Sequence, residues 1–261
     1  MDLESHVIRV LLDQGKTKIP PIYPVGPILS LDGKSQQGDQ DQDSIMAWLD
    51  EQPLSSVVFL CFGSMGGFEA DQVREIANGL DQSGYRFLWS LPRSAPKGDL
   101  GSSIENDNLN EVLPKGFVDR TAHRGKIVKW VSKVQILAHK AIGGFVTHCG
   151  WNSILESVWF GVPMATWPLY SEQQLNAFEL VKELGLAVEI SIDYRLNFGI
   201  GKGNYLVTAE EVENGVKRVM NIDDEIRGKV RDIRNLSRKA LKVGGSSNHN
   251  LGRFIEEVLH I

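Results

Sequence analysis

Short apolar runs alternate with stretches of helical periodicity along most of this 261-residue chain. The first run, Ser55 to Phe62, is nearly all apolar, as expected for a strand that is covered on both faces. A helical pattern follows from Glu69 to Ser83, with an apolar stripe through Val73, Ile76 and Leu80. Strands that alternate with helices are typical of parallel sheets with crossover helices. We therefore expect an α/β fold, a Rossmann-like parallel sheet with helices on both faces.

Further runs rich in β-branched or aromatic residues continue this pattern. A later helix is predicted to begin at Thr208, because its hydroxyl and the carboxylate of Glu211 can form a capping box. Two polar, glycine-containing stretches, Ser94 to Asn110 and Tyr194 to Asn204, fit neither pattern and are expected to be surface loops. The further predicted strands are Arg86 to Ser90, Lys126 to Trp130, Gly143 to Thr147, Pro163 to Thr166 and Ala187 to Ile190.

The amino-terminal part of the chain differs in composition from the rest. Leu3 to Leu12 has the apolar spacing of a single amphipathic helix. Residues 18–44 contain a proline-rich run and then a Gln/Asp/Gly tract, which indicates a linker. We therefore expect a helix within residues 1–17, a linker at 18–44 and one folded domain at 45–261.

Composition and charge exclude several classes of protein. The net charge of -5, without a long basic run, argues against a nucleic-acid-binding face. No apolar run approaches the about 18 residues of a membrane span, and the amino terminus does not resemble a signal sequence. The two cysteines, Cys61 and Cys149, lie in apolar stretches and are expected to be buried, reduced thiols. These features predict a cytoplasmic protein with no integral membrane segment and no nucleic-acid partner.

The strand ending at Thr147 leads through a short turn into a helix that begins near Asn152. The first turn of a helix has unpaired N–H groups and a partial positive charge, which together bind anions. Asn152 and Ser153 can add side-chain hydrogen bonds, and His148 can donate to the same oxygens. The alternative is that Asn152 or Ser153 only caps the helix.

Other polar and aromatic side chains follow the ends of the predicted strands. Glu156 lies one helical turn further on, where its carboxylate can accept hydrogen bonds from the vicinal hydroxyls of a ribose. Trp130 can stack on a base, although a tryptophan at a strand end is more often part of the core. Glu172 and Gln173 suit a ligand with many hydroxyls, and Ser64 lies in a loop after the first strand. Ligands of open parallel sheets bind beyond the carboxyl ends of the strands, where these residues fall.

The stretch from Trp130 to Gln173 closely resembles the signature box of plant family 1 UDP-glycosyltransferases. The surrounding chain, from the run IPPIYPVGP to the final helix, is similar to the carboxyl-terminal half of such enzymes. The resemblance implies the carboxyl-terminal, UDP-sugar-binding domain of a GT-B glycosyltransferase. It further implies a glucose donor, since the box ends in Gln, and inverting transfer to hydroxyls of small molecules such as plant secondary metabolites, without a metal or other cofactor.

The resemblance assigns a role to each matching residue. Trp130 would stack on the uracil, the backbone of Val131 would pair with the base, and Ser64 would approach the nucleotide. The remaining donor contacts would be His148, Asn152 and Ser153 to the diphosphate, Glu156 to the ribose, and Glu172 and Gln173 to the sugar.

The sequence departs from the family's pattern at Ser132 and Lys133, where Pro and Gln are usual. Lys133 is expected either to reach a phosphate or to point to water, and the absence of the proline frees the loop, so nucleotide binding is expected to be weaker or altered rather than lost. The family's acceptor-activating His, which an Asp orients, has no counterpart here, so no catalytic residue is assigned. We therefore expect a donor-binding part that is inactive alone and needs a complementary amino-terminal domain, which the first and final helices would contact.

Two other functions share some of these features. A dinucleotide-dependent oxidoreductase has the same alternation of strands and helices, but the sequence lacks the GxGxxG turn. A noncatalytic UDP-sugar sensor or scaffold would keep the donor contacts and lack the base, and the sequence leaves this alternative open.

Overall fold

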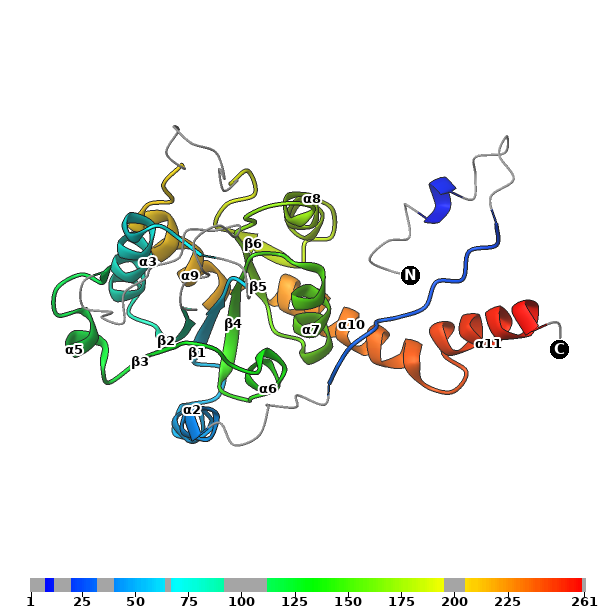
Figure 1. Cartoon of the computed structure of the whole chain (residues 1–261), viewed down its shortest axis with the longest axis horizontal. Helices are drawn as coiled ribbons and strands as arrows, with labels where there is room; N and C mark the ends of the chain where they lie inside the picture. The colour runs from blue at the N-terminus through cyan, green and yellow to red at the C-terminus, as the bar shows by residue number, and fades with distance from the viewer. Residues whose placement is uncertain are drawn as a thin grey trace.

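A computed structural model describes residues 8–11, 20–31, 40–63, 67–91, 112–194 and 205–259. Within these residues the strands form one parallel sheet in the order β3-β2-β1-β4-β5-β6 (Figure 1). The order reverses between β1 and β4, and ligands of such sheets bind beyond the carboxyl ends of the strands at this point. The strands are β1 Val57–Cys61, β2 Arg86–Ser90, β3 Gly125–Val128, β4 Ile142–Thr147, β5 Met164–Thr166 and β6 Ala187–Glu189.

Helices cover both faces of the sheet, and each face has its own apolar core. On one face Val58 and Leu60 of β1 pack with α3, α5 and α9, and on the other Val57 and Phe59 pack with α2, α6, α7 and α8. Alternate residues of one strand therefore serve the two cores, which explains its unbroken apolar sequence. The helices are α2 Gln40–Asp50, α3 Ala70–Ser83, α5 Phe117–Thr121, α6 Lys133–Leu137, α7 Trp151–Phe160, α8 Gln173–Phe178, the π-helical η1 Glu179–Glu183, α9 Ala209–Met220, α10 Asp224–Leu241 and α11 Ser246–Leu259.

The predicted fold class is confirmed, and the element boundaries differ by a few residues. β2 has the predicted bounds, whereas β3 begins one residue early and ends two residues before Trp130, because its pairing with β2 stops at Val128. The predicted capping box of Thr208 and Glu211 is present, with bonds of 2.8 and 3.3 Å. Helix α2 begins at Gln40, within the predicted linker, and buries Ile45 and Leu49 against the sheet.

The extended residues 20–31 run beside α10 and α11, away from the body of the sheet (Figure 1). The N–H of Gly26 donates to Ser247 Oγ at 2.7 Å, and Asn250 Nδ2 donates to the oxygen of Pro24 at 2.9 Å. In the final helix, α11, the apolar side chains of Leu251, Ile255 and Val258 are exposed.

Several predictions fall partly or wholly outside the described residues. Residues 8–11 of the predicted first helix are helical, and the rest of it is outside. The predicted loop from Ser94 to Asn110 lies outside the described residues. Of the predicted loop from Tyr194 to Asn204, only Tyr194 is described, and it is buried. In the described parts of the chain, no helix combines the length and the apolar character that crossing a membrane requires.

Candidate functional site

The turn from β4 to α7 leaves the amino terminus of α7 open to a ligand. The turn residue Cys149 has a φ of 62°, a left-handed conformation that non-glycine residues seldom adopt outside functional sites. The residue that caps α7 is Gly150, which has no side chain that could bond to the first-turn N–H groups. Neither Asn152 nor Ser153 therefore serves as the cap, and the helix keeps the donors that an anion needs.

His148 lies between the two strands at which the sheet order reverses. Its side chain is largely buried, and its Nδ1 has no hydrogen-bond partner among the residues that the structure describes. Two glycines leave room for the ring, because a Cβ would lie 2.8 Å from Nε2 at Gly63 and 2.6 Å from it at Gly150. Burial, and then the charge of Lys133, lower the pKa of His148 to about 4. At neutral pH His148 is an uncharged imidazole that can offer a hydrogen bond to a ligand.

Lys133, at the start of α6, joins two candidate residues of α7. Its Nζ donates to Ser153 Oγ at 2.6 Å and lies 3.1 Å from Glu156 Oε2. The lysine side chain is only 22% exposed, so of the two alternatives for Lys133 the one in which it points to water does not hold. Glu156 Oε2 is buried and has ion-pair proximity to the ammonium without a hydrogen bond. This oxygen is therefore an acceptor that a ligand hydroxyl can use.

Glu172 and Gln173 begin α8, directly after β5 and its following turn. Gln173 is buried, and its Oε1 accepts hydrogen bonds from the backbone N–H groups of Leu169 and Tyr170 at 2.9 and 3.1 Å. Because these bonds occupy Oε1, the side chain offers a ligand its Nε2 donor. Glu172 is exposed and has no side-chain capping bond to α8.

The remaining predicted contacts lie in loops after β3 and β1. Trp130 is 56% exposed, so it is not part of the core, which was the alternative for this residue. The next residue, Val131, is buried among the side chains beneath α6 and α7. Ser64 lies outside the described residues.

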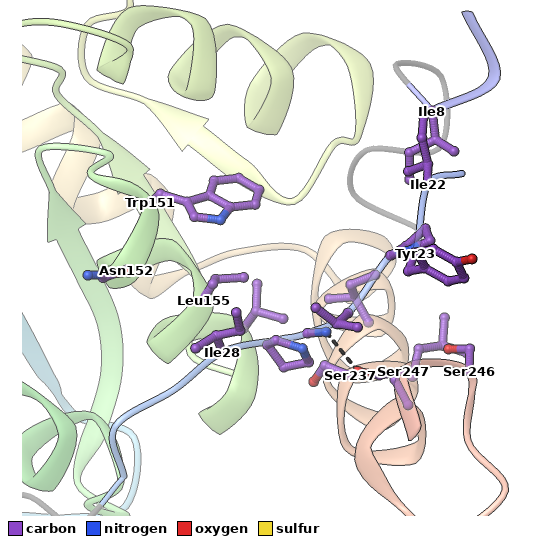
Figure 2. Close-up of a pocket in the computed structure, with 18 residues that line it drawn as sticks. Ile8, Ile22, Tyr23, Ile28, Trp151, Asn152, Leu155, Ser237, Ser246 and Ser247 are labelled. Atoms are coloured by element: carbon purple, nitrogen blue, oxygen red, sulfur yellow. Dashed lines mark hydrogen bonds between the residues drawn. The ribbon is translucent and has the colours of Figure 1, made fainter. Parts of the chain in front are cut away.

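A separate cavity of about 620 Å³ lies between α7, α10 and residues 22–28 (Figure 2). Trp151 and Leu155 extend toward it, and Asn152 also lines it, although its side-chain amide points away. Its lining is largely aliphatic and includes neither His148, Lys133 nor Glu156. The polar cluster, and not this cavity, therefore has the groups that a charged ligand would need.

Two contributors to the site were not singled out from the sequence. Asn176 donates through Nδ2 to the oxygen of Cys149 at 2.9 Å and so fixes the strained turn from α8. Gly150 makes room for the His148 ring. One signal for Asn176 exists, since it lies three residues after Gln173, a spacing that places both on the same side of a helix.

Fold and site together define a Rossmann-like α/β domain with an anion-accepting helix amino terminus and polar groups for a hydroxylated ligand at its topological switch point. Comparison with known proteins gives the particular family. The chain belongs to the UDP-glucoronosyl and UDP-glucosyl transferase family, which it matches over residues 21–228. The resemblance to plant UDP-glycosyltransferases is thereby confirmed.

Curated relatives and solved structures agree with this membership. Anthocyanidin 3-O-glucosyltransferase 6 of Manihot esculenta is 55% identical over 100% of this chain and 64% of its own length. UDP-glycosyltransferase 1 of Panax ginseng is 52% identical over 99% of this chain and 54% of its own length. A transferase from Siraitia grosvenorii in complex with UDP has a TM-score of 0.88 at 50% identity and covers 99% of this chain. Medicago truncatula UGT71G1, complexed with UDP-glucose, has a TM-score of 0.85 at 49% identity and covers 98% of this chain.

The chain spans only part of these proteins. It covers 58% of the Siraitia grosvenorii chain and 52% of the Medicago truncatula chain. The activity, the acceptor and the partner domain are properties of the whole proteins. For this chain they are therefore proposals.

Proposed function

We propose that this chain is the UDP-sugar-binding part of an inverting glycosyltransferase that transfers glucose to hydroxyls of small molecules. The donor is UDP-glucose, and the acceptors belong to the class of plant secondary metabolites. The chemistry uses no metal or other cofactor, and the protein acts in the cytoplasm. The support comes from the family membership and from relatives that are named as glucosyltransferases or complexed with UDP and UDP-glucose.

One observation carries the donor-binding part of the proposal. The uncapped amino terminus of α7, the unpartnered Nδ1 of His148 and the buried Oε2 of Glu156 lie together beyond the ends of β1 and β4. A buried polar atom without a partner, such as His148 Nδ1, is costly, and a ligand that supplies the missing bond removes that cost. A nucleoside diphosphate has phosphate oxygens for the first two groups and ribose hydroxyls for the third.

The proposed roles follow from this geometry. The amino terminus of α7, Asn152, Ser153 and His148 hold the diphosphate, and Glu156 holds the ribose. Trp130, whose ring is exposed, stacks on the uracil, beside the backbone of Val131, with Ser64 near the nucleotide. The sugar contacts are Glu172 and the Nε2 donor of Gln173.

In the proposed reaction the acceptor hydroxyl attacks the anomeric carbon of the donor, and UDP leaves. Negative charge grows on the departing diphosphate, where preorganised N–H donors stabilise it most effectively. His148 contributes as an uncharged donor, because burial keeps it neutral at neutral pH. The group that takes the acceptor's proton belongs to a complementary amino-terminal domain. Loss of such a general base costs about 10²–10⁴-fold in rate, so the chain alone is inactive.

Calorimetric titration of the purified chain with UDP, UDP-glucose and NADH tests the donor site. Saturable binding of UDP and UDP-glucose, without binding of NADH, is the expected result. The absence of binding to either uridine nucleotide would refute the proposed function. Addition of a separately made amino-terminal domain of a plant relative tests the second part, since only a split transferase regains glucosyl transfer.

A further inference from the structure

The first observation concerns the position of Lys133, at the start of α6. Its Nζ bridges Ser153 Oγ at 2.6 Å and Glu156 Oε2 at 3.1 Å. These two side chains come from the same face of α7, one near its first turn and one about a turn deeper. The ammonium therefore lies between the groups proposed for the diphosphate and for the ribose.

The second observation is the distribution of charge in the site. His148 is neutral at neutral pH, and Glu156 and Glu172 are acidic residues. Among the described residues proposed to contact the donor and the side chains that touch them within the site, Lys133 is thus the one cation. Its field reaches the surrounding strand ends, because it contributes to lowering the pKa of His148 and that of Cys61, although burial raises the pKa of Cys61 on balance.

The third observation concerns the hydrogen bonds of the bridge. Lys133 donates to the oxygen of Ser153, so the hydroxyl proton remains free to donate to a ligand. Glu156 Oε2 has the ammonium nearby but no hydrogen bond. A ribose hydroxyl can therefore take this oxygen if the ammonium moves toward the helix amino terminus. Lysine has a flexible four-carbon stem that permits such a movement.

We propose that Lys133 makes this site select its ligand by phosphate charge, an inference that rests on the proposed donor site. When a nucleoside diphosphate binds, the ammonium turns from Glu156 to the phosphates, and the ribose hydroxyls replace it at Glu156. The ammonium then donates to the phosphate as a full positive charge, whereas a glutamine would donate from an uncharged amide.

The consequence is a different response of charged and uncharged ligands. Uridine has no phosphate, so its ribose competes with Lys133 for Glu156, and nothing compensates the displaced ammonium. UDP compensates it fully, because the ammonium gains a new anionic partner. Lys133 therefore disfavours the nucleoside and favours the diphosphate, which a neutral side chain at this position does not do.

Calorimetry with uridine, UMP and UDP on the wild-type chain, Lys133→Gln and Lys133→Arg tests this inference. In Lys133→Gln the affinity for UDP is expected to fall about tenfold, as for loss of a hydrogen bond to a charged group. The affinity for uridine is expected to stay the same or rise. Lys133→Arg keeps the charge and should retain most of the preference for UDP.

Lys182→Gln is the matched control, because it removes another ion-paired lysine, 2.9 Å from Glu189, and neither residue has a proposed donor contact. It changes net charge equally and should leave all three affinities unaltered. An increase in salt from about 50 to about 300 mM should weaken UDP binding, because salt screens the phosphate contacts. In Lys133→Gln this weakening should be smaller, because one phosphate contact is lost.

The outcomes separate this inference from the proposed function. If the wild-type chain binds UDP and Lys133→Gln binds it equally well or better, Lys133 only holds Glu156 in place. The inference then fails, while the proposed function stands. If the wild-type chain binds neither UDP nor uridine, both the inference and the proposed function fail.

Discussion

The side-chain amide of Asn176 donates a hydrogen bond of 2.9 Å to the backbone oxygen of Cys149. Asn176 belongs to α8, whereas Cys149 is the left-handed residue of the turn that leads into α7. Both groups are buried. This bond therefore ties the helix that begins with the proposed sugar contacts to the turn that precedes the proposed diphosphate contacts.

Asn176→Ala should weaken UDP binding although Asn176 has no proposed contact with UDP. The change leaves a buried carbonyl unpaired, which costs about 1–3 kcal/mol of stability, and frees the strained turn to relax. We expect a several-fold loss of UDP affinity by calorimetry and a lower urea midpoint.

Asn250→Ala provides the control for that prediction. Asn250 makes a similar 2.9 Å bond through Nδ2 to the oxygen of Pro24, in a different part of the chain. Its removal should leave UDP affinity unchanged. If both variants lost affinity to the same degree, general destabilisation would explain the effect of Asn176→Ala.

Trp130→Ala should weaken UDP binding with little effect on folding. Stacking of a base on an aromatic ring contributes about 1–3 kcal/mol, so the expected loss in affinity is roughly 5- to 150-fold. Because the side chain is 56% exposed, its truncation should change the free energy of unfolding by at most about 0.5 kcal/mol. Trp130→Phe keeps a ring and should recover part of the affinity. An unaltered affinity in Trp130→Ala would rule out the stacking role.

The fold was predictable because its signals are local. The apolar sequence of β1 follows from burial on both faces, and the capping box at Thr208 depends on two residues of one helix turn. The end of β3 was not predictable, because it depends on where the ladder with β2 stops. The start of α2 was missed since its polar first turn has no apolar pattern, and its place depends on packing of Ile45 and Leu49.

The candidate site could be predicted only in part from local sequence patterns. Local sequence patterns predict that helix α7 begins just after β4 and that His148 lies beside its first turn. The direction of Lys133 depends on how α6 packs against α7, which no periodicity encodes. The bond from Asn176 to Cys149 likewise joins residues that are 27 positions apart.

Gly150→Ala should weaken UDP binding by displacing the His148 ring. The φ and ψ of Gly150, -64° and 138°, are allowed for alanine, so the backbone is not strained. The added Cβ would lie 2.6 Å from His148 Nε2, and the ring must move. We expect UDP affinity to fall about three- to tenfold, as for the loss of one hydrogen bond. Gly252→Ala, where a Cβ meets nothing within 4 Å inside α11, should leave the affinity unchanged.

The protein should lose stability as the pH falls from about 6.5 to about 4 through protonation of His148 in the unfolded chain. The folded pKa is lowered from 6.5 to about 4, first by burial and then by Lys133. Between these values the unfolded state binds more protons than the folded state, so stability rises with pH in this window and is constant above it. The full effect is on the order of 3 kcal/mol.

His148→Gln separates this contribution from that of the carboxylates, which also titrate in acid. Urea unfolding of both proteins at pH 7, 5.5 and 4.5 should give a difference in stability that moves in favour of the variant as the pH falls. Lys133→Gln should raise the pKa of His148 in an NMR titration, because it removes the nearby positive charge. A stability difference that is constant across this range would mean that the imidazole protonates as readily in the folded protein as in the unfolded chain, and that its neutral state is not enforced by the site.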